Sequence, residues 1–240
     1  MIRTLEETGS TNSDLAAQLR AGEVVREGDW LVADRQIAGR GRQGRTWFDG
    51  SGNFMGSTVV HLGPRDPAPA SLALVAGLAA YEAVVPYLVD PSALLLKWPN
   101  DLVLAGAKLA GILLEREGDA IIVGMGINLA RAPDLPDRRT VALASLGPAP
   151  DRDAFAASLA AAFDRELDRW RTYGIEPLGR RWESVAHKRG TSLTVHPPGE
   201  GPIEGAFAGL AADGSLMLRL ADGTNRAIRA GDVMLATEER

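Results

Sequence analysis

Short runs of apolar residues, separated by turn-forming residues, recur through the first half of the chain and predict strands. Two of these runs flank the tight Ala105-Gly106-Ala107 turn, which indicates a β-hairpin. Strands are expected at residues 2–7, 30–33, 54–62, 93–98, 102–104, 108–115 and 120–126.

Helical periodicity appears between these strands and again after them. Thr11 or Asn12 is placed to cap a helix that ends near Gly22, and a long helix follows Pro69. The apolar stretch 71–89 is interrupted by a glutamate and a proline and is rich in alanine and glycine, so we expect a buried core helix and no membrane span. After a proline-rich loop, further helices are expected at residues 153–173 and 177–188.

From Thr191 onward the residue pattern changes to short apolar segments separated by Gly and Asp turns. Short strands are expected at 192–196, 203–210, 216–220 and 227–228, with Asp-Gly pairs as hairpin turns between them. This pattern predicts two domains, residues 1–188 and a small β-barrel over 189–240. The fold class is therefore α+β, with a mixed sheet, helices on one of its faces and a small C-terminal barrel.

Composition and charge exclude several classes of function. The chain has no cysteine and only three widely spaced histidines, which excludes thiolate chemistry and disfavours a histidine-built metal site. Its net charge of −5 disfavours broad nucleic-acid binding. The first residues lack an apolar signal region, so a cytoplasmic location without membrane attachment is expected.

A local basic segment stands out in this acidic chain. The stretch from Gly39 to Gly44 matches G-x-G-x-x-G, but turn-forming residues follow it where a dinucleotide-binding motif requires a helix. Arginines 35, 40, 42 and 45 lie close together here, and guanidinium groups bind phosphate and carboxylate in a bidentate way. The loop is thus either a clamp for an anionic ligand or simply a solvated basic loop.

Three further motifs carry candidate chemistry. Lys97-Trp98-Pro99-Asn100-Asp101 ends an apolar strand, where Lys97 suits phosphate and Asp101 suits Mg²⁺, although a surface turn with an ion pair fits as well. Lys108 begins an apolar strand and points either to solvent or into a pocket. The segment Gly124–Asn128 closes the next strand and permits close approach of a ligand.

Together these segments resemble the catalytic domain of biotin–protein ligases. The matching segments occur in the family's order and cover about residues 9–128: Gly9-Ser10-Thr11-Asn12, Gly39-Arg40-Gly41-Arg42-Gln43-Gly44-Arg45-Thr46-Trp47, Lys97-Trp98-Pro99-Asn100-Asp101, Lys108-Leu109-Ala110-Gly111-Ile112 and Gly124-Met125-Gly126-Ile127-Asn128. The resemblance implies the fold of class II aminoacyl-tRNA synthetases, with an SH3-like C-terminal domain. It implies ATP-dependent activation of biotin as biotinyl-5′-AMP, followed by transfer to a lysine of a biotin carboxyl carrier protein.

The resemblance also implies roles for individual residues. Lys108, Arg40 and Arg42 would be catalytic, and Asp101 would help to bind Mg²⁺. Biotin would contact Ser10, Thr11, Asn12, Gln36, Arg40, Gly41, Arg42 and Lys108. The nucleotide would contact Arg42, Arg45, Trp47, Lys97, Asn100 and Asn128.

Other functions remain open at this stage. A lipoate–protein ligase shares the fold and the chemistry but needs an apolar groove, whereas the Ser10–Asn12 segment and Gln36 favour a ureido ring. A non-catalytic biotin or nucleotide sensor is disfavoured because Lys108 and Asp101 are present. The Gly9–Asn12 motif begins too early for a preceding helix-turn-helix domain, so a monofunctional ligase without specific DNA binding is expected. A homodimer is compatible with the family.

Overall fold

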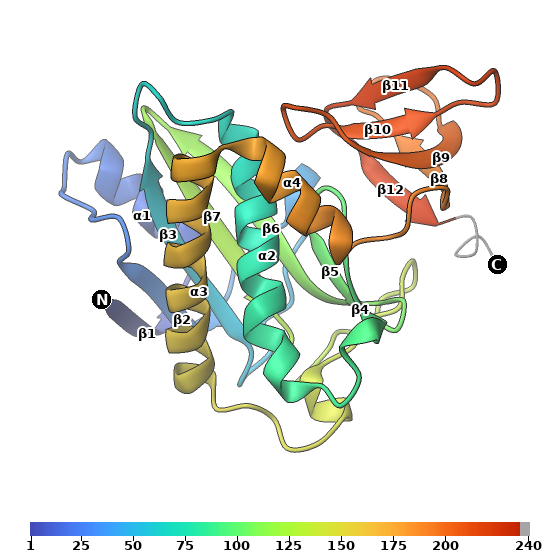
Figure 1. Ribbon diagram of the computed structural model, residues 1–240. Coiled ribbons are helices and arrows are strands. Elements are labelled where there is room, and N and C mark those ends of the chain that lie inside the picture. Colours follow the sequence, from blue (N-terminus) through green and yellow to red (C-terminus); the bar gives the residue numbers. More distant parts are fainter. Residues whose placement is uncertain (236–240) are drawn as a thin grey trace.

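A seven-stranded mixed sheet forms the centre of the protein, in a computed structural model that describes residues 1–235 (Figure 1). The strand order is β1-β2-β3-β7-β6-β5-β4; β1 and β2 are parallel, and every other pair is antiparallel. The strands are β1 (Ile2–Thr8), β2 (Trp30–Gln36), β3 (Phe54–His61), β4 (Leu94–Lys97), β5 (Asp101–Leu104), β6 (Ala107–Glu117) and β7 (Ala120–Ile127).

The two faces of this sheet differ because successive side chains of a strand point to opposite sides. Trp30 and Val32 of β2 join the main hydrophobic core, whereas Leu31 between them joins a smaller apolar cluster on the other face. In β7, Ile121 belongs to the main core and Ile122 to the smaller cluster on the other face. The smaller cluster packs against α1 (Thr11–Arg20), so this helix covers the face opposite to the main core.

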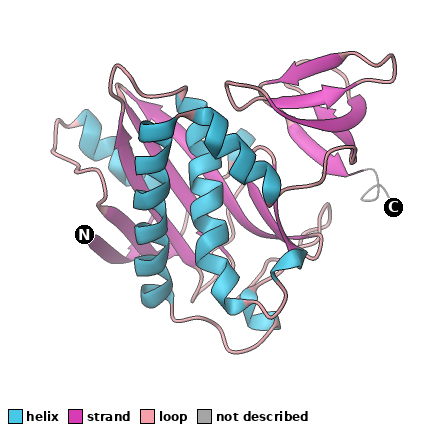
Figure 2. Ribbon diagram, viewed as in Figure 1, coloured by secondary structure: helices cyan, strands magenta, loops and turns pink. Residues whose placement is uncertain are grey.

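The main core lies between the sheet and three helices, α2 (Leu72–Val84), α3 (Arg152–Tyr173) and α4 (Ile175–Ser184) (Figure 2). The α2 region is the one segment among the described residues that is apolar and long enough to cross a membrane by composition, and 61% of its most apolar window is buried inside the structure. It packs against α3 and several strands, so it serves as the core helix that the sequence predicts.

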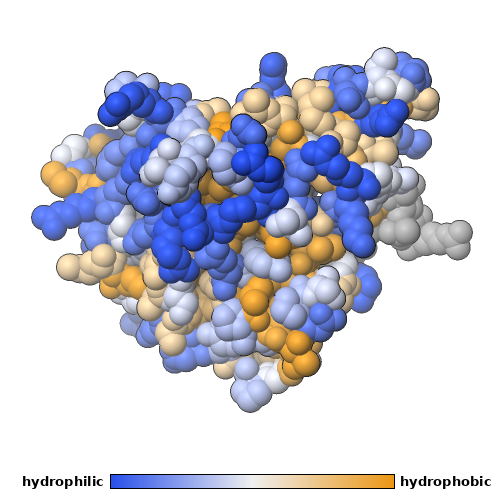
Figure 3. All heavy atoms as spheres, in the orientation of Figure 1, coloured by the Kyte–Doolittle hydropathy of each residue, from blue (hydrophilic) through white to orange (hydrophobic). Residues whose placement is uncertain are grey.

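The outer surfaces of α3 and α4 are polar, and Figure 3 shows hydrophilic side chains gathered over them. Beneath this surface Glu166 is fully buried and accepts hydrogen bonds from Arg169 and Arg181. Arg181 also reaches Glu82 of α2, at 2.8 Å. A buried carboxylate requires such partners, and here they join three helices.

A second, five-stranded antiparallel sheet follows α4, in the order β11-β10-β9-β8-β12. It packs onto the first part of the chain, because Leu193, Val195 and Phe207 belong to the same core cluster as Trp98 and Trp182. The strands are β8 (Ser192–His196), β9 (Ile203–Leu210), β10 (Leu216–Arg219), β11 (Asn225–Ile228) and β12 (Asp232–Leu235).

The predicted fold class and nearly all predicted elements are confirmed, with local differences. Ser10, not Thr11 or Asn12, is the residue that precedes the first turn of α1. The helix α1 covers the second face of the sheet, while α2, α3 and α4 share the predicted one. The last helix begins and ends earlier than expected, and β12 was not predicted. The domain boundary after residue 188 stays a prediction, and residues 236–240 of the expected second domain lie outside the described residues.

We predict that Trp170→Ala lowers the free energy of unfolding by about 3–5 kcal/mol, because it leaves a large cavity in the core. Trp170 is fully buried in α3, and its indole N–H donates to the Ser71 hydroxyl at 2.8 Å. Tyr173→Ala, in the same helix, is the control; its side chain is 67% exposed, and we expect a change within about 0.5 kcal/mol. Urea denaturation followed by circular dichroism measures both, and equal losses would contradict the assignment of Trp170 to the core.

Candidate active site

A chain of neutral hydrogen-bonding side chains is buried where α1 meets the sheet. The Thr11 backbone N–H donates to Gln36 Oε1 at 2.7 Å, and the Thr11 and Ser57 hydroxyls lie 2.6 Å apart. Ser57 donates to Asn12 Oδ1 at 2.6 Å. These four side chains are at most 8% exposed, and Ser10 beside them is also buried. The group offers donors and acceptors to a small polar ligand without presenting a net charge.

Glycine makes room for this group. Asn12 lies directly over Gly124 of β7, where a Cβ atom would overlap the Asn12 side-chain amide. The Gln36 amide nitrogen is 3.3 Å from the position that a Cβ of Gly39 would take. The glycines of these motifs therefore allow close packing of polar side chains against the backbone.

A β-bulge in β6 positions Lys108. Across the β5–β6 pair, Leu102 is opposite Ala110 but Val103 is opposite Lys108, so Leu109 is an extra residue in β6. Leu109 and Ala110 consequently both point into the main core, and Lys108 and Gly111 share the α1 face. From there Lys108 donates to Asp101 Oδ1 at 2.6 Å, with both side chains about four-fifths buried.

Trp47 covers a floor made of two glycines. A Cβ at Gly111 would come within 2.9 Å of the Trp47 ring, and one at Gly126 would overlap it. The Lys108 ammonium lies 5.8 Å from the centroid of the same ring. The indole N–H is buried and has no hydrogen-bond partner within residues 1–235, as is also true of Asn128 Oδ1. Buried polar atoms normally have partners, so Asn128 Oδ1 at the end of β7 is an acceptor that a ligand could use.

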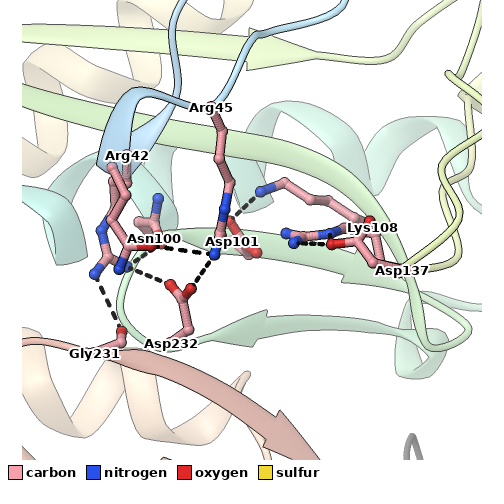
Figure 4. A network of polar contacts seen from close by, with 10 residues as sticks. Arg42, Arg45, Asn100, Asp101, Lys108, Asp137, Gly231 and Asp232 are labelled. Atoms are coloured by element: carbon pink, nitrogen blue, oxygen red, sulfur yellow. Dashed lines mark hydrogen bonds and ion pairs between the residues drawn. The ribbon is translucent and has the colours of Figure 1, made fainter. Parts of the chain in front are cut away.

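The arginine-rich loop between β2 and β3 turns back on itself beside this floor. The Gly41 N–H donates to the Arg45 carbonyl at 2.7 Å, and Arg40 pairs through its backbone with Thr46 while its side chain is exposed. Gln43 takes a left-handed conformation with φ of 57° at the tip. The turn brings the side chains of Arg42 and Arg45 to one side (Figure 4).

Both of these arginines reach the C-terminal sheet. Arg42 donates to Asn100 Oδ1 at 3.0 Å and to the Gly231 carbonyl at 3.1 Å. Arg45 forms an ion pair with Asp232 of β12. Figure 4 shows that Asp101 and Lys108 lie alongside these contacts. Five residues from the loop, the Lys97–Asp101 motif and β6 thus lie close together in the folded chain.

The loop that follows β7 supplies a further cation. Arg138 donates to Asp137 at 2.5 Å and 3.0 Å, and this hydrogen bond raises the pKa of Arg138. The nearby carboxylates of Asp101 and Asp232 raise it further. The same hydrogen bond holds the pKa of Asp137 below its ordinary value. Arg138 therefore stays charged beside the Asp101–Lys108 pair.

The remaining predicted site residues lie nearby. Lys97 is partly buried and is the register partner of Asp101 in the β4–β5 hairpin. Asn100 donates to the Ile112 carbonyl at 2.7 Å, which fixes its orientation. Asn128 is buried at the end of β7 and donates to the Val141 carbonyl at 3.2 Å.

Sequence reasoning missed several residues of this region: Ser57, Glu115, Arg138, Gly231 and Asp232. Ser57 and Thr58 are small polar residues within an otherwise apolar strand, and this was the available signal for Ser57. Glu115 accepts a hydrogen bond from Asn12 at 2.6 Å, a contact across 103 residues that no local pattern indicates. The other three come from loops and from β12, which pack onto the site only in the folded chain.

This arrangement places a buried group of neutral polar side chains near a glycine floor and a cluster of cations, which pair with Asp101, Asp137 and Asp232. Such a site can hold a small polar molecule next to a polyanion and can stabilise charge that develops between them. Within residues 1–235 there is no group of three or more carboxylates and histidines that would bind a metal by itself. These are the features of an enzyme that activates an acid with a nucleotide.

Comparison with known proteins identifies the class. Residues 7–129 match the model of the biotin/lipoate A/B protein ligase family, and residues 195–235 match the biotin protein ligase C terminal domain. The chain belongs to the biotin/lipoate A/B protein ligase family.

Individual relatives resemble nearly the whole chain. A biotin–[acetyl-CoA-carboxylase] ligase of Paracoccus denitrificans is 37% identical over 90% of this chain and 92% of its own length. One from Mycobacterium tuberculosis is 34% identical over 97% of this chain and 88% of its own. The solved structure of the Aquifex aeolicus biotin protein ligase in complex with biotin and ATP has a TM-score of 0.84 and 29% identity, covering 98% of this chain and 97% of that one.

We predict that Gly126→Ala displaces the Trp47 indole, because the added Cβ has no space beneath the ring. One tryptophan should then become more accessible to quenching by acrylamide. Gly147→Ala is the matched control, since a Cβ there meets nothing within 4 Å. If quenching of the Gly126 variant equals that of wild type, Trp47 does not rest on this glycine.

Proposed function

We infer that this chain is an ATP-dependent ligase that activates biotin as biotinyl-5′-AMP and transfers the biotinyl group to a lysine of a biotin carboxyl carrier protein. Family membership and the two biotin–[acetyl-CoA-carboxylase] ligases, which match along most of their length, support this function. Biotin and ATP are the substrates.

The observation that carries the proposal is the junction of a neutral pocket and a cationic cluster on one face of the sheet. A ureido ring needs donors and acceptors without charge, as the buried chain from Gln36 to Asn12 provides. A carboxylate that attacks a triphosphate needs cations to screen the two anions, and Lys108, Arg42 and Arg45 lie there. Both substrates are thus held next to each other, which itself lowers the barrier.

We assign biotin to the pocket under α1. Ser10, Thr11, Asn12 and Gln36 are buried around the place for the ureido ring. The carboxylate end of biotin extends toward Lys108 along the turn of the arginine loop. Arg40, Gly41 and Arg42 are the residues of that loop that we assign to the carboxylate and to the adenylate phosphate.

We assign ATP to the region beside Trp47, next to the glycine floor that the indole covers. Trp47 packs on the adenine ring, and the unpartnered Asn128 Oδ1 is an acceptor for the nucleotide. Arg42, Arg45, Lys97 and Asn100 surround the phosphates. Because Arg42 and Arg45 are bound to β12 in this structure, they must exchange a carbonyl and a carboxylate for phosphate oxygens when ATP binds.

Lys108 is the residue that we expect to act on the reacting atoms. Its ammonium would bridge the biotin carboxylate and the α-phosphate, and it would stabilise charge as the carboxylate attacks phosphorus and pyrophosphate leaves. Mg²⁺ needs only one or two carboxylates in addition to phosphates, so Asp101 fits as its protein ligand, and the ion would neutralise phosphate charge. In the second step the acceptor lysine attacks the mixed anhydride and AMP leaves, without a covalent enzyme intermediate.

A lipoate–protein ligase is the nearest alternative, because the family model includes lipoate ligases. Two observations favour biotin: the C-terminal segment matches a biotin protein ligase domain, and the pocket under α1 is polar where a dithiolane would need apolar walls. We also propose that the protein is cytoplasmic and does not bind specific DNA sequences. A homodimer is compatible with the family.

The proposed activity is tested by incubating the protein with ATP, Mg²⁺, biotin and a purified biotin carboxyl carrier domain. We expect the intact mass of the acceptor to increase by one biotinyl group, and we expect ATP–pyrophosphate exchange to depend on both biotin and Mg²⁺. Replacing the acceptor lysine by arginine is the control for the site of transfer. Exchange that responds to lipoate and not to biotin would overturn the proposal.

We predict that Lys108→Ala slows adenylation by about a hundredfold to a thousandfold, the usual loss when a preorganised interaction with developing charge is removed. The chain has three lysines, and Lys188→Ala is the control because Lys188 is exposed and far along the chain from the motifs. Single-turnover formation of biotinyl-AMP gives the rate, and circular dichroism checks the fold. Normal turnover would show that Lys108 only forms the ion pair with Asp101.

A further inference from the structure

The hydrogen-bond chain under α1 continues beyond the pocket to a carboxylate. Asn12 Nδ2 donates to Glu115 Oε2 of β6 at 2.6 Å. Glu115 is exposed, whereas the other members of the chain, Asn12, Ser57, Thr11 and Gln36, are buried. One ionisable group at the edge of the site is therefore connected to the neutral pocket through consecutive hydrogen bonds.

This carboxylate determines which group donates and which accepts in each of these consecutive hydrogen bonds. An ionised carboxylate only accepts hydrogen bonds, so the Asn12 amide must turn its nitrogen toward Glu115 and its oxygen toward Ser57. The Ser57 hydroxyl then donates its single proton to Asn12 Oδ1. Ser57 can therefore only accept from Thr11. In the 2.6 Å contact between the two hydroxyls, Thr11 is the donor and Ser57 the acceptor.

The direction decides what the pocket offers to a ligand. The Thr11 hydroxyl, which also lies 3.1 Å from Gln36 Oε1, gives its proton in the shorter contact with Ser57, so its oxygen presents a lone pair. Gln36 Oε1 is held by the Thr11 backbone N–H at 2.7 Å, and its amide nitrogen therefore points the other way, toward Gly39. The pocket thus combines an acceptor at Thr11 with a donor at Gln36. A cyclic urea, which has N–H groups beside a carbonyl, requires this combination.

We propose that Glu115 is a positioning residue that sets the donor and acceptor polarity of the biotin pocket and thereby its specificity for a ureido ring. The inference rests on the proposed function, because it takes the pocket under α1 as the place for that ring. Glu115 does not touch the ligand; it acts through Asn12 and Ser57.

A lysine at this position provides a sharp test because it only donates. In Glu115→Lys the Asn12 oxygen turns toward the new ammonium, and its nitrogen turns toward Ser57. Ser57 then donates to Thr11, and the Thr11 proton points into the pocket against a ureido N–H. Glu115→Gln can donate or accept, so it permits both polarities and is the milder variant.

Glu117 supplies the matched control. It lies two residues further along β6, on the same face of the strand, and pairs with Arg20 at the other end of α1 at 2.7 Å. Glu117→Lys therefore makes the same change of charge and also removes a contact between β6 and α1, but it leaves the hydrogen-bond chain intact.

We expect Glu115→Lys to weaken biotin binding by about tenfold to a hundredfold, the range for leaving a buried donor of the ligand without an acceptor. Glu115→Gln should lose less, and Glu117→Lys should bind like wild type. Calorimetry with biotin in the absence of ATP measures the affinity. In turnover, the KM for biotin should rise while kcat at saturating biotin stays near that of wild type, because a ground-state contact is lost.

A biotin analogue with one ring N–H replaced by oxygen, a cyclic carbamate, separates polarity from general damage. This analogue presents an acceptor where biotin presents a donor, so the preference for biotin over the carbamate should shrink in Glu115→Lys. An equal loss of affinity for both ligands, or unchanged biotin binding in both Glu115 variants, would overturn the proposal. If wild type does not bind biotin at all, the proposed function fails instead.

Discussion

The structure depends on the alternation of side chains across one seven-stranded sheet. One face of the sheet must be apolar, because α2 and α3 bury it, and the residues that point the other way are thereby free to be polar or small. Ser57, Gly124 and Gly126 take those positions in two neighbouring strands. The hydrophobic core and the candidate site are therefore formed by alternate residues of the same strands. A shift of register by one residue would move each set of side chains to the other face.

Lys108 shows how a local irregularity in this alternation produces chemistry. In a regular strand Lys108 and Gly111 would point to opposite faces. The lysine would then no longer lie in the space that the missing side chain of Gly111 leaves open. The extra residue Leu109 removes that conflict, because the core receives two consecutive apolar residues while the ammonium still reaches Asp101. The arginine loop and the loop after β7 then complete a cluster of cations around a pair of charges that the sheet itself holds.

Much of this was predictable from the sequence because the elements are short, strongly patterned and separated by clear turns. Segments such as 54–62 and 153–173 follow from the residue pattern, and the motifs together with the family resemblance pointed to Thr11, Gln36, Arg42 and Lys108 as candidates. The bulge at Leu109 was not predictable, since both Leu109 and Ala110 fit a regular strand by composition. Nor were the contacts of Asp232 and Glu115, because each joins residues that only tertiary packing brings together.

The packing of Trp98 has a consequence for how the protein unfolds. Its indole N–H donates to the Gly214 carbonyl at 3.1 Å, and its ring belongs to the core cluster that also contains Phe207 and Leu216 of the C-terminal sheet. Trp98 is followed along the chain by Pro99, Asn100 and Asp101. Detaching the C-terminal sheet would expose this ring to water and release the turn that carries Asn100 and Asp101. The contacts of Trp98 therefore couple the two sheets, and we expect the smaller sheet to unfold together with the larger one.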